Sequence, residues 1–183
     1  MPEEGVVAVG LKVVALADPS EKSFVEDFES FYAAERRSIL GLAYVLSGSR
    51  SGAEDLAQEA FMAAYRNWER VSGYDDPGAW VRRVVANAAV SWLRRRAAEA
   101  RALLRLGQPD FTIPEIDPGA ELVWREVRRL PARQAQAIAL RYFDGREVSE
   151  IARVLSCSES TIHTHLRRGK ESLARRLADR GST

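Results

Sequence analysis

The sequence predicts an all-α protein made of two small helical domains joined by a flexible linker, the second ending in a helix-turn-helix. Apolar residues recur at helical spacing from Phe24 onward, and no alternating strand pattern of useful length follows residue 22. Residues 107–119 hold three prolines and two glycines and lack helical spacing, which is typical of a linker. We therefore expect an N-terminal extension over residues 1–22, a helical domain over 23–104, a linker over 105–118 and a second domain over 119–183. The extension is expected to be mobile.

The first domain is expected to contain three helical stretches. Apolar stripes over residues 24–46 end at the Ser-Gly-Ser break of residues 47–49. Ser51, with Glu54 three residues later, predicts a capping box for the next helix. A loop over residues 73–78 then leads into a third helix that starts near Ala79.

The second domain is expected to contain four helices. Residues 122–130 and 133–143 read as helices, with Pro131 at the start of the second one. Asp144 and Gly145 form a strong turn signal. The helix-turn-helix over residues 147–170 completes this unit.

Residues 147–170 are the most informative segment for function. The first helix has an apolar stripe, a polar break follows, and Ser158 is a suitable N-cap for the second helix. Ile162 and Leu166 face inward in that second helix. Small polar and cationic residues occupy its outward faces, namely Ser160, Thr161, His163, Thr164, Arg167 and Arg168. This layout is typical of a DNA-binding helix-turn-helix, although two ordinary surface helices would give a similar pattern.

The charge distribution supports a nucleic-acid partner. The whole chain has a net charge of only +1, but residues 79–106 hold seven arginines against one glutamate. Residues 119–183 hold thirteen basic residues against eight acids. Two cationic blocks separated by an acidic connector predict two surfaces that face phosphates.

Several other classes of protein are disfavoured. Cys157 is the only cysteine, which excludes an intramolecular disulfide and a cysteine zinc site. His163 and His165 lie about 200° apart around a helix, so they cannot easily share a metal, and we expect neither a metal nor a cofactor. No catalytic spacing supports a helical enzyme, so we expect no catalytic residue. The longest apolar run, residues 6–16, is too short for a membrane span and lacks signal-peptide features, which favours the cytoplasm.

Two blocks in the first domain carry functional side chains. Asp55, Gln58 and Glu59 share one helix face by their spacing, and this face is either a docking surface or an ordinary solvated one. Trp80 and Asn87 lie seven residues apart beside several arginines, a combination suited to holding unpaired bases. Trp80 is equally suited to the core and to stacking, whereas Trp92 has the apolar neighbours of a core residue.

These motifs together resemble the extracytoplasmic-function sigma factors, the bacterial promoter-specificity subunits that carry only sigma regions 2 and 4. Residues 53–61 are similar to region 2.2, and residues 80–87 and 92–96 are similar to regions 2.3 and 2.4. Residues 130–134, 140–145 and the helix-turn-helix are similar to region 4. The resemblance covers about residues 24–178. Residues 1–22 have no counterpart, and the two histidines stand where basic or small residues are more usual.

The resemblance implies a bacterial sigma factor that binds core RNA polymerase through Asp55, Gln58 and Glu59. It implies contact with the minus-ten promoter element by Tyr74, Trp80, Arg83, Asn87, Arg94 and Arg95. The outward residues of the last helix would bind the minus-thirty-five element: Ser160, Thr161, His163, Thr164, Arg167 and Arg168. An anti-sigma factor is a further partner of such proteins, whereas a membrane or a small-molecule substrate is not expected. The alternative is a stand-alone helix-turn-helix regulator, which would leave the first domain's two motifs without a role.

Overall fold

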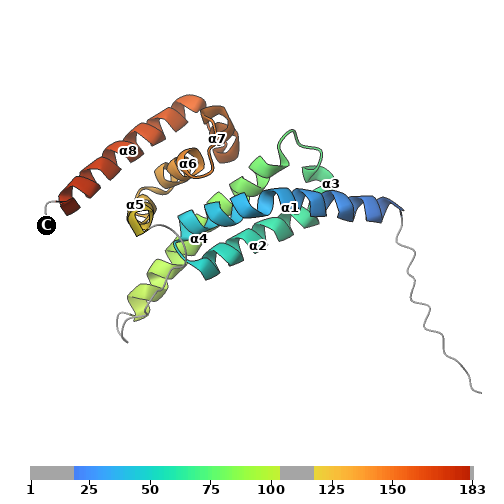
Figure 1. The fold of residues 1–183 in the computed structure, drawn as a ribbon, viewed down its shortest axis with the longest axis horizontal. Helices are drawn as coiled ribbons and strands as arrows, with labels where there is room; N and C mark the ends of the chain where they lie inside the picture. The colour runs from blue at the N-terminus through green and yellow to red at the C-terminus, as the bar shows by residue number, and fades with distance from the viewer. Residues whose placement is uncertain (1–18, 104–117, 182–183) are drawn as a thin grey trace, which may run out of the picture.

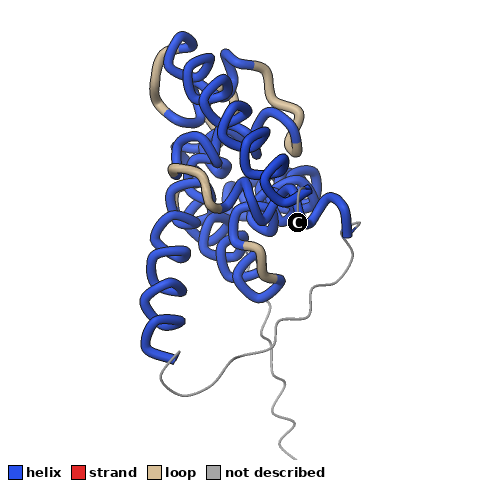
Figure 2. Tube along the Cα trace, turned by 90° about the vertical axis from the view of Figure 1, so that its left-hand side faces the viewer, coloured by secondary structure: helices blue, strands red, loops and turns tan. Residues whose placement is uncertain are grey.

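The computed structural model describes residues 19–103 and 118–181, which form helices without any strand, as the all-α prediction requires (Figures 1 and 2). The N-terminal half consists of α1 (Pro19–Ser47), α2 (Arg50–Arg66), α3 (Trp68–Val71) and α4 (Pro77–Leu103). The C-terminal half consists of α5 (Pro118–Arg128), α6 (Ala132–Tyr142), α7 (Val148–Leu155) and α8 (Glu159–Gly181). Helices α1, α2 and α4 lie side by side, and the C-terminal half packs along one side of them.

Helix α1 is a single continuous helix, although its apolar residues form two stripes in the sequence. It begins at Pro19, inside the expected extension of residues 1–22. Proline is favoured in the first turn because its missing N–H has no helical partner there in any case. Residues 1–18 of that extension, and residues 105–117 of the expected linker, lie outside the described residues.

The start of α2 differs from the prediction, because its N-cap is Ser49 rather than Ser51. Gly48 has a φ of +71°, so the chain leaves α1 in a left-handed conformation. Ser49 is then extended, and its Oγ accepts a hydrogen bond of 3.1 Å from the N–H of Gly52. The predicted capping box at Ser51 is therefore wrong, since the turn closes two residues earlier.

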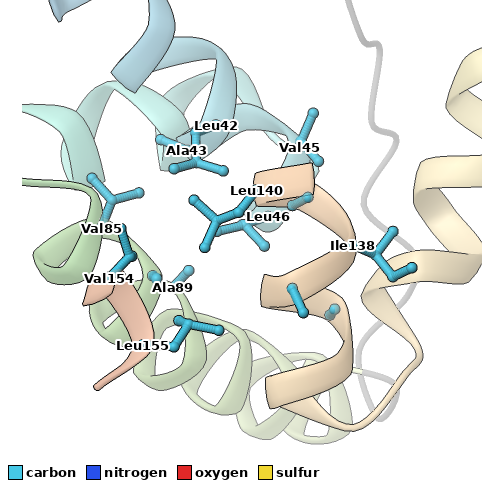
Figure 3. Packing of buried hydrophobic residues seen from close by; sticks show 14 of the residues in the cluster. Leu42, Ala43, Val45, Leu46, Val85, Ala89, Ile138, Leu140, Val154 and Leu155 are labelled. Carbon is cyan, nitrogen blue, oxygen red and sulfur yellow. The ribbon is translucent and has the colours of Figure 1, made fainter. Parts of the chain in front are cut away.

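The two halves share one hydrophobic core, which the sequence did not lead us to expect. Leu140 of α6 lies next to Leu46 and Leu42 of α1 (Figure 3). Val154 and Leu155 of α7 lie over α4. All of these side chains are buried in the same cluster. The C-terminal half is therefore seated on α1 and α4 in this structure.

A buried ionic cluster also joins the two halves. Arg82 of α4 is 2% exposed, and its Nε donates to the carboxylate of Asp144, which is 1% exposed, at 2.6 Å. The same guanidinium pairs with Glu35 of α1 at 2.9 Å. Ser38 of α1 donates to Asp144, and Arg146 pairs with Asp144 at 2.9 Å. Asp144 lies in the turn between α6 and α7, so the cluster fixes that turn against α1 and α4.

The turn of the helix-turn-helix contains a strained residue. Ser156 has a φ of +54°, a left-handed conformation that costs a residue with a side chain about 1–2 kcal/mol. Glycine is the usual residue at this position after a helix. Ser156→Gly is therefore expected to raise the free energy of unfolding by roughly 0.5–1 kcal/mol, measured by urea denaturation. A destabilised variant would contradict the view that the backbone at Ser156 is strained.

Candidate nucleic-acid interface

The predicted docking face on α2 is open to solvent. Asp55, Gln58 and Glu59 are all exposed, while Leu56 and Ala57 between them are buried. The three polar residues therefore share one face, as their spacing predicts.

This docking face continues into an apolar groove that the sequence analysis missed. Gln58 lines an open groove of about 580 Å³ between α1 and α2, with Tyr32 and Phe61 in its wall. Met62 and Tyr65 lie one and two turns after Gln58 and are 45% and 46% exposed. Large apolar side chains exposed beside polar ones are typical of protein-binding surfaces. Met62 and Tyr65 follow Gln58 by four and seven residues, and this helical spacing could have placed them on the docking face from the sequence.

The loop before α4 is held at the start of that helix. Asp76 accepts a hydrogen bond of 2.8 Å from the N–H of Ala79, so it caps α4. Tyr74 is 40% exposed on this loop, and Trp80 is half-buried on the first turns of α4. Together with Arg83 they line an open cavity of about 390 Å³. The cavity has an aromatic wall and a cation, which suits an unstacked base.

The other minus-ten candidates lie further along α4. Asn87 is exposed about one turn beyond Arg83. Arg94 and Arg95 are exposed and begin about 16 Å further along the helix axis than Arg83. They form a separate cationic surface, of the kind that tracks a phosphate backbone.

Trp92 faces the core side, as predicted. Its indole lies so close to Gly52 of α2 that a Cβ at position 52 would sit 2.5 Å from it. The guanidinium of Arg96 lies 5.7 Å from the indole ring centre, within the range of a cation–π interaction. Trp80 packs on the core and also lines the cavity, and its stacking role stays a prediction.

Arg83 already has partners in the C-terminal half. Its Nε donates to the carbonyl of Val154 at 3.0 Å, and a terminal nitrogen donates to the carbonyl of Arg153. These carbonyls belong to the last turn of α7, where the helix dipole attracts a cation; the carbonyl of Arg153 also accepts a hydrogen bond of 3.4 Å from the N–H of Ser156. The side chain of Arg153 also lines the cavity beside Tyr74 and Trp80.

Helix α8 has a well-defined N-cap and exposes the residues predicted to bind DNA. The Oγ of Ser158 accepts a hydrogen bond of 3.3 Å from the N–H of Thr161, which confirms Ser158 as the cap of α8. Ile162 and Leu166 are buried, and Gly169 lies against Ile138 of α6. The outward set is exposed or half-buried, comprising Ser160, Thr161, His163, Thr164, Arg167 and Arg168.

Hydrogen bonds within α8 restrain several of the outward side chains. Thr164 Oγ1 donates to the carbonyl of Ser160 at 3.0 Å, and Arg167 pairs with Glu171 at 2.9 Å on the exposed face. Burial and then the nearby Arg133 and Arg168 lower the pKa of His165, which favours its neutral form. Across the described ranges no group of acids, histidines and Cys157 is placed to hold a metal. None of the described helices is long and apolar enough to span a membrane.

Comparison with known proteins places the same two regions on this chain. Residues 31–99 match the family model described as sigma-70 region 2, and residues 120–173 match the one described as sigma-70, region 4. The chain is 28% identical over 157 residues to the ECF RNA polymerase sigma factor SigW of Bacillus subtilis, covering 77% of this chain and 83% of SigW. It is also 28% identical to the ECF RNA polymerase sigma factor SigM of Mycobacterium tuberculosis, covering 82% of this chain and 76% of SigM.

A solved structure has a similar fold. It is the sigma factor RpoE of Bartonella quintana in complex with the anti-sigma factor NepR. The match has a TM-score of 0.68 at 22% identity and covers 84% of this chain and 98% of that one. It supports the arrangement of the helices.

Proposed function

Since the chain belongs to the extracytoplasmic-function sigma factors, which initiate transcription with RNA polymerase, we propose that its two helical halves bind two separate promoter elements. The C-terminal half positions the protein on duplex DNA. The N-terminal half holds the strand that separates. The chain carries no catalytic activity of its own in this proposal and acts in the cytoplasm, where the polymerase works.

The exposed face of α8 supports upstream binding. Its cap at Ser158 fixes where the helix begins, and its buried face is seated on α6. The outward hydroxyls and the two arginines then lie on the face that would enter a major groove, where arginine can pair with guanine at two positions. Arg167 is the best base-reading candidate, because it is exposed and pairs with Glu171, whose side chain is exposed as well.

The cavity at the start of α4 supports strand capture. Tyr74 and Trp80 offer aromatic faces, and Asn87 offers a polar edge one turn beyond Arg83. Arg94 and Arg95 lie where the phosphate backbone of the captured strand would continue. These six residues together are proposed to bind the minus-ten element.

The face with Asp55, Gln58 and Glu59 is proposed to dock on core RNA polymerase. The groove with Met62 and Tyr65 extends this face with an apolar surface. An anti-sigma factor is a proposed second partner, because a structurally similar sigma factor is held by one. The stand-alone regulator is not favoured, since residues 31–99 match sigma region 2, which it would not need.

Run-off transcription with core polymerase tests the proposal. We expect the purified chain to direct core polymerase to a defined set of start sites on genomic templates. The control is core polymerase alone, which should give no such specific transcripts. Tight duplex binding by the isolated chain, with no specific transcript in the presence of core, would show that it is a regulator instead.

Arg167→Ala tests upstream readout. If Arg167 reads a base, promoter use should fall by the equivalent of about 1–3 kcal/mol. Arg175→Ala is the matched control, since Arg175 is exposed about 12 Å further along α8, away from the proposed contact. Competition between templates with native and scrambled upstream sequences distinguishes a base contact from a phosphate contact. An equal loss on both would make Arg167 a phosphate contact rather than a base reader.

A further inference from the structure

An apolar pocket of about 280 Å³ lies where the two halves meet, between α4 and α6. Leu46 at the end of α1 and Leu130 in the turn before α6 form part of its wall. Ala89 of α4 and Ala135 of α6 belong to the same wall, and their short side chains keep the pocket open where a leucine would fill it. Apolar pockets between packed helices, with few polar groups in the lining, are the usual form of small-molecule sites.

The polar groups of this pocket are two arginines and one glutamine, and most of them already have partners. Arg128 pairs with Glu121, and Gln136 donates from Nε2 to a backbone carbonyl of α4 at 2.7 Å. Arg94 is exposed, and within the described ranges its guanidinium has no hydrogen bond or ion pair. Arg94 is therefore the cation of the described lining that remains available to a ligand.

The volume and the cation together define the chemistry of the ligand. A cavity of about 150 Å³ holds benzene, so a pocket of about 280 Å³ holds roughly eleven non-hydrogen atoms. Arginine binds a carboxylate through two parallel hydrogen bonds, which favours a ligand with one acidic end. A nucleotide is too large for this volume, and its sugar would leave polar groups unpaired against apolar walls.

We propose that this pocket binds a small apolar monocarboxylate, such as a medium-chain fatty acid. The apolar body lies between α4 and α6, and the carboxylate accepts hydrogen bonds from Arg94. Binding at this site does not depend on the proposed promoter contacts. Its consequence for transcription does rest on the proposed function: a carboxylate on Arg94 would compete with the minus-ten strand for the same guanidinium.

Titration calorimetry of the full chain with octanoate tests the site. Octanoate fits the volume of the pocket, and 1-octanol and octylamine carry the same alkyl group with a neutral and a positive head. We expect octanoate to bind saturably at one site. We expect 1-octanol to bind at least about tenfold more weakly, because it lacks the charge that pairs with Arg94. Octylamine, which is protonated at neutral pH, should show no saturable binding.

Two substitutions locate the bound octanoate. Arg94→Gln should weaken octanoate binding at least about tenfold and leave the binding of 1-octanol unchanged. Arg125→Gln is the matched control, because Arg125 is equally exposed and lies on α5 outside the pocket lining. Ala135→Leu adds carbons inside the pocket and should weaken the binding of both octanoate and 1-octanol. Circular dichroism checks the fold of each variant, and Arg94→Gln keeps the proposal testable if Ala135→Leu fails to fold.

The outcomes decide between this site and nonspecific binding. Saturable octanoate binding that falls in Arg94→Gln and persists in Arg125→Gln supports the proposal. Equal losses in both variants overturn it, because diffuse positive charge would then explain the binding. The proposal also fails if octanoate does not bind saturably, or if a folded Ala135→Leu variant binds it as well as the unchanged chain does. None of these measurements uses DNA or polymerase, so a failure of run-off transcription would refute the proposed function alone.

Discussion

Replacing Arg82 by methionine is expected to lower the free energy of unfolding by about 3 kcal/mol. Arg82 is 2% exposed and pairs with an Asp144 that is 1% exposed, so its removal leaves buried acceptors short of a cation. Arg146 and Ser38 still contact Asp144, which places the loss near the lower end of the usual 3–5 kcal/mol for a broken buried pair. Urea denaturation followed by tryptophan fluorescence measures the change.

Arg50→Met is the control for this experiment. Arg50 also pairs with a glutamate, at 3.1 Å, but the side chains of Arg50 and Glu54 are 70% and 57% exposed. Exposed pairs contribute little because water screens them, so the loss should stay within about 0.5 kcal/mol. Adding Asp144→Asn to Arg82→Met should recover part of the loss, since the uncompensated charge is removed. Equal losses for Arg82 and Arg50 would contradict the role given to burial.

Reversing the charges of Asp55 and Glu59 together to lysine is expected to weaken core-polymerase binding at least about a hundredfold. The two carboxylates are exposed on one face of α2, beside the groove with Met62 and Tyr65. Like charges placed across an interface cost several kcal/mol, and a hundredfold change corresponds to about 2.8 kcal/mol. Binding of the labelled chain to purified core, measured by fluorescence anisotropy, tests this expectation.

The control reverses two other exposed acids, Glu26 and Asp27 on α1, and so changes the net charge equally. Circular dichroism should report unchanged helix content for both double variants. If the two variants lost affinity equally, net charge alone would explain the effect. If neither lost affinity, the docking face would lie elsewhere on the molecule.

Local patterns in the sequence predicted much of the fold. The cap at Ser158 and the buried Ile162 and Leu166 follow from helical spacing and cap chemistry, which depend on neighbours within one or two turns. The same reasoning correctly separated Asp55, Gln58 and Glu59 from the buried residues between them. The role of each of these residues in binding stays a prediction.

The contact between the halves could not be predicted in this way. Arg82 and Arg83 are neighbours in one cationic block, but one is buried on Asp144 and the other is exposed against the end of α7. Which of them turns inward depends on a partner 62 positions away in the chain. The exposed Met62 and Tyr65 were overlooked for a similar reason, since apolar residues at helical spacing are more often core.

Gly41 shows how such a long-range contact leaves a trace in sequence. A glycine inside a long helix costs about 1 kcal/mol relative to alanine, so a glycine within α1, before its last turn, requires a compensating benefit. That benefit is the room for the ring of Phe143, which any side chain at position 41 would crowd. Among relatives, glycine at this position and an aromatic residue at position 143 should therefore be gained and lost together. Such covariation would identify from sequence alone the family members whose halves close on each other.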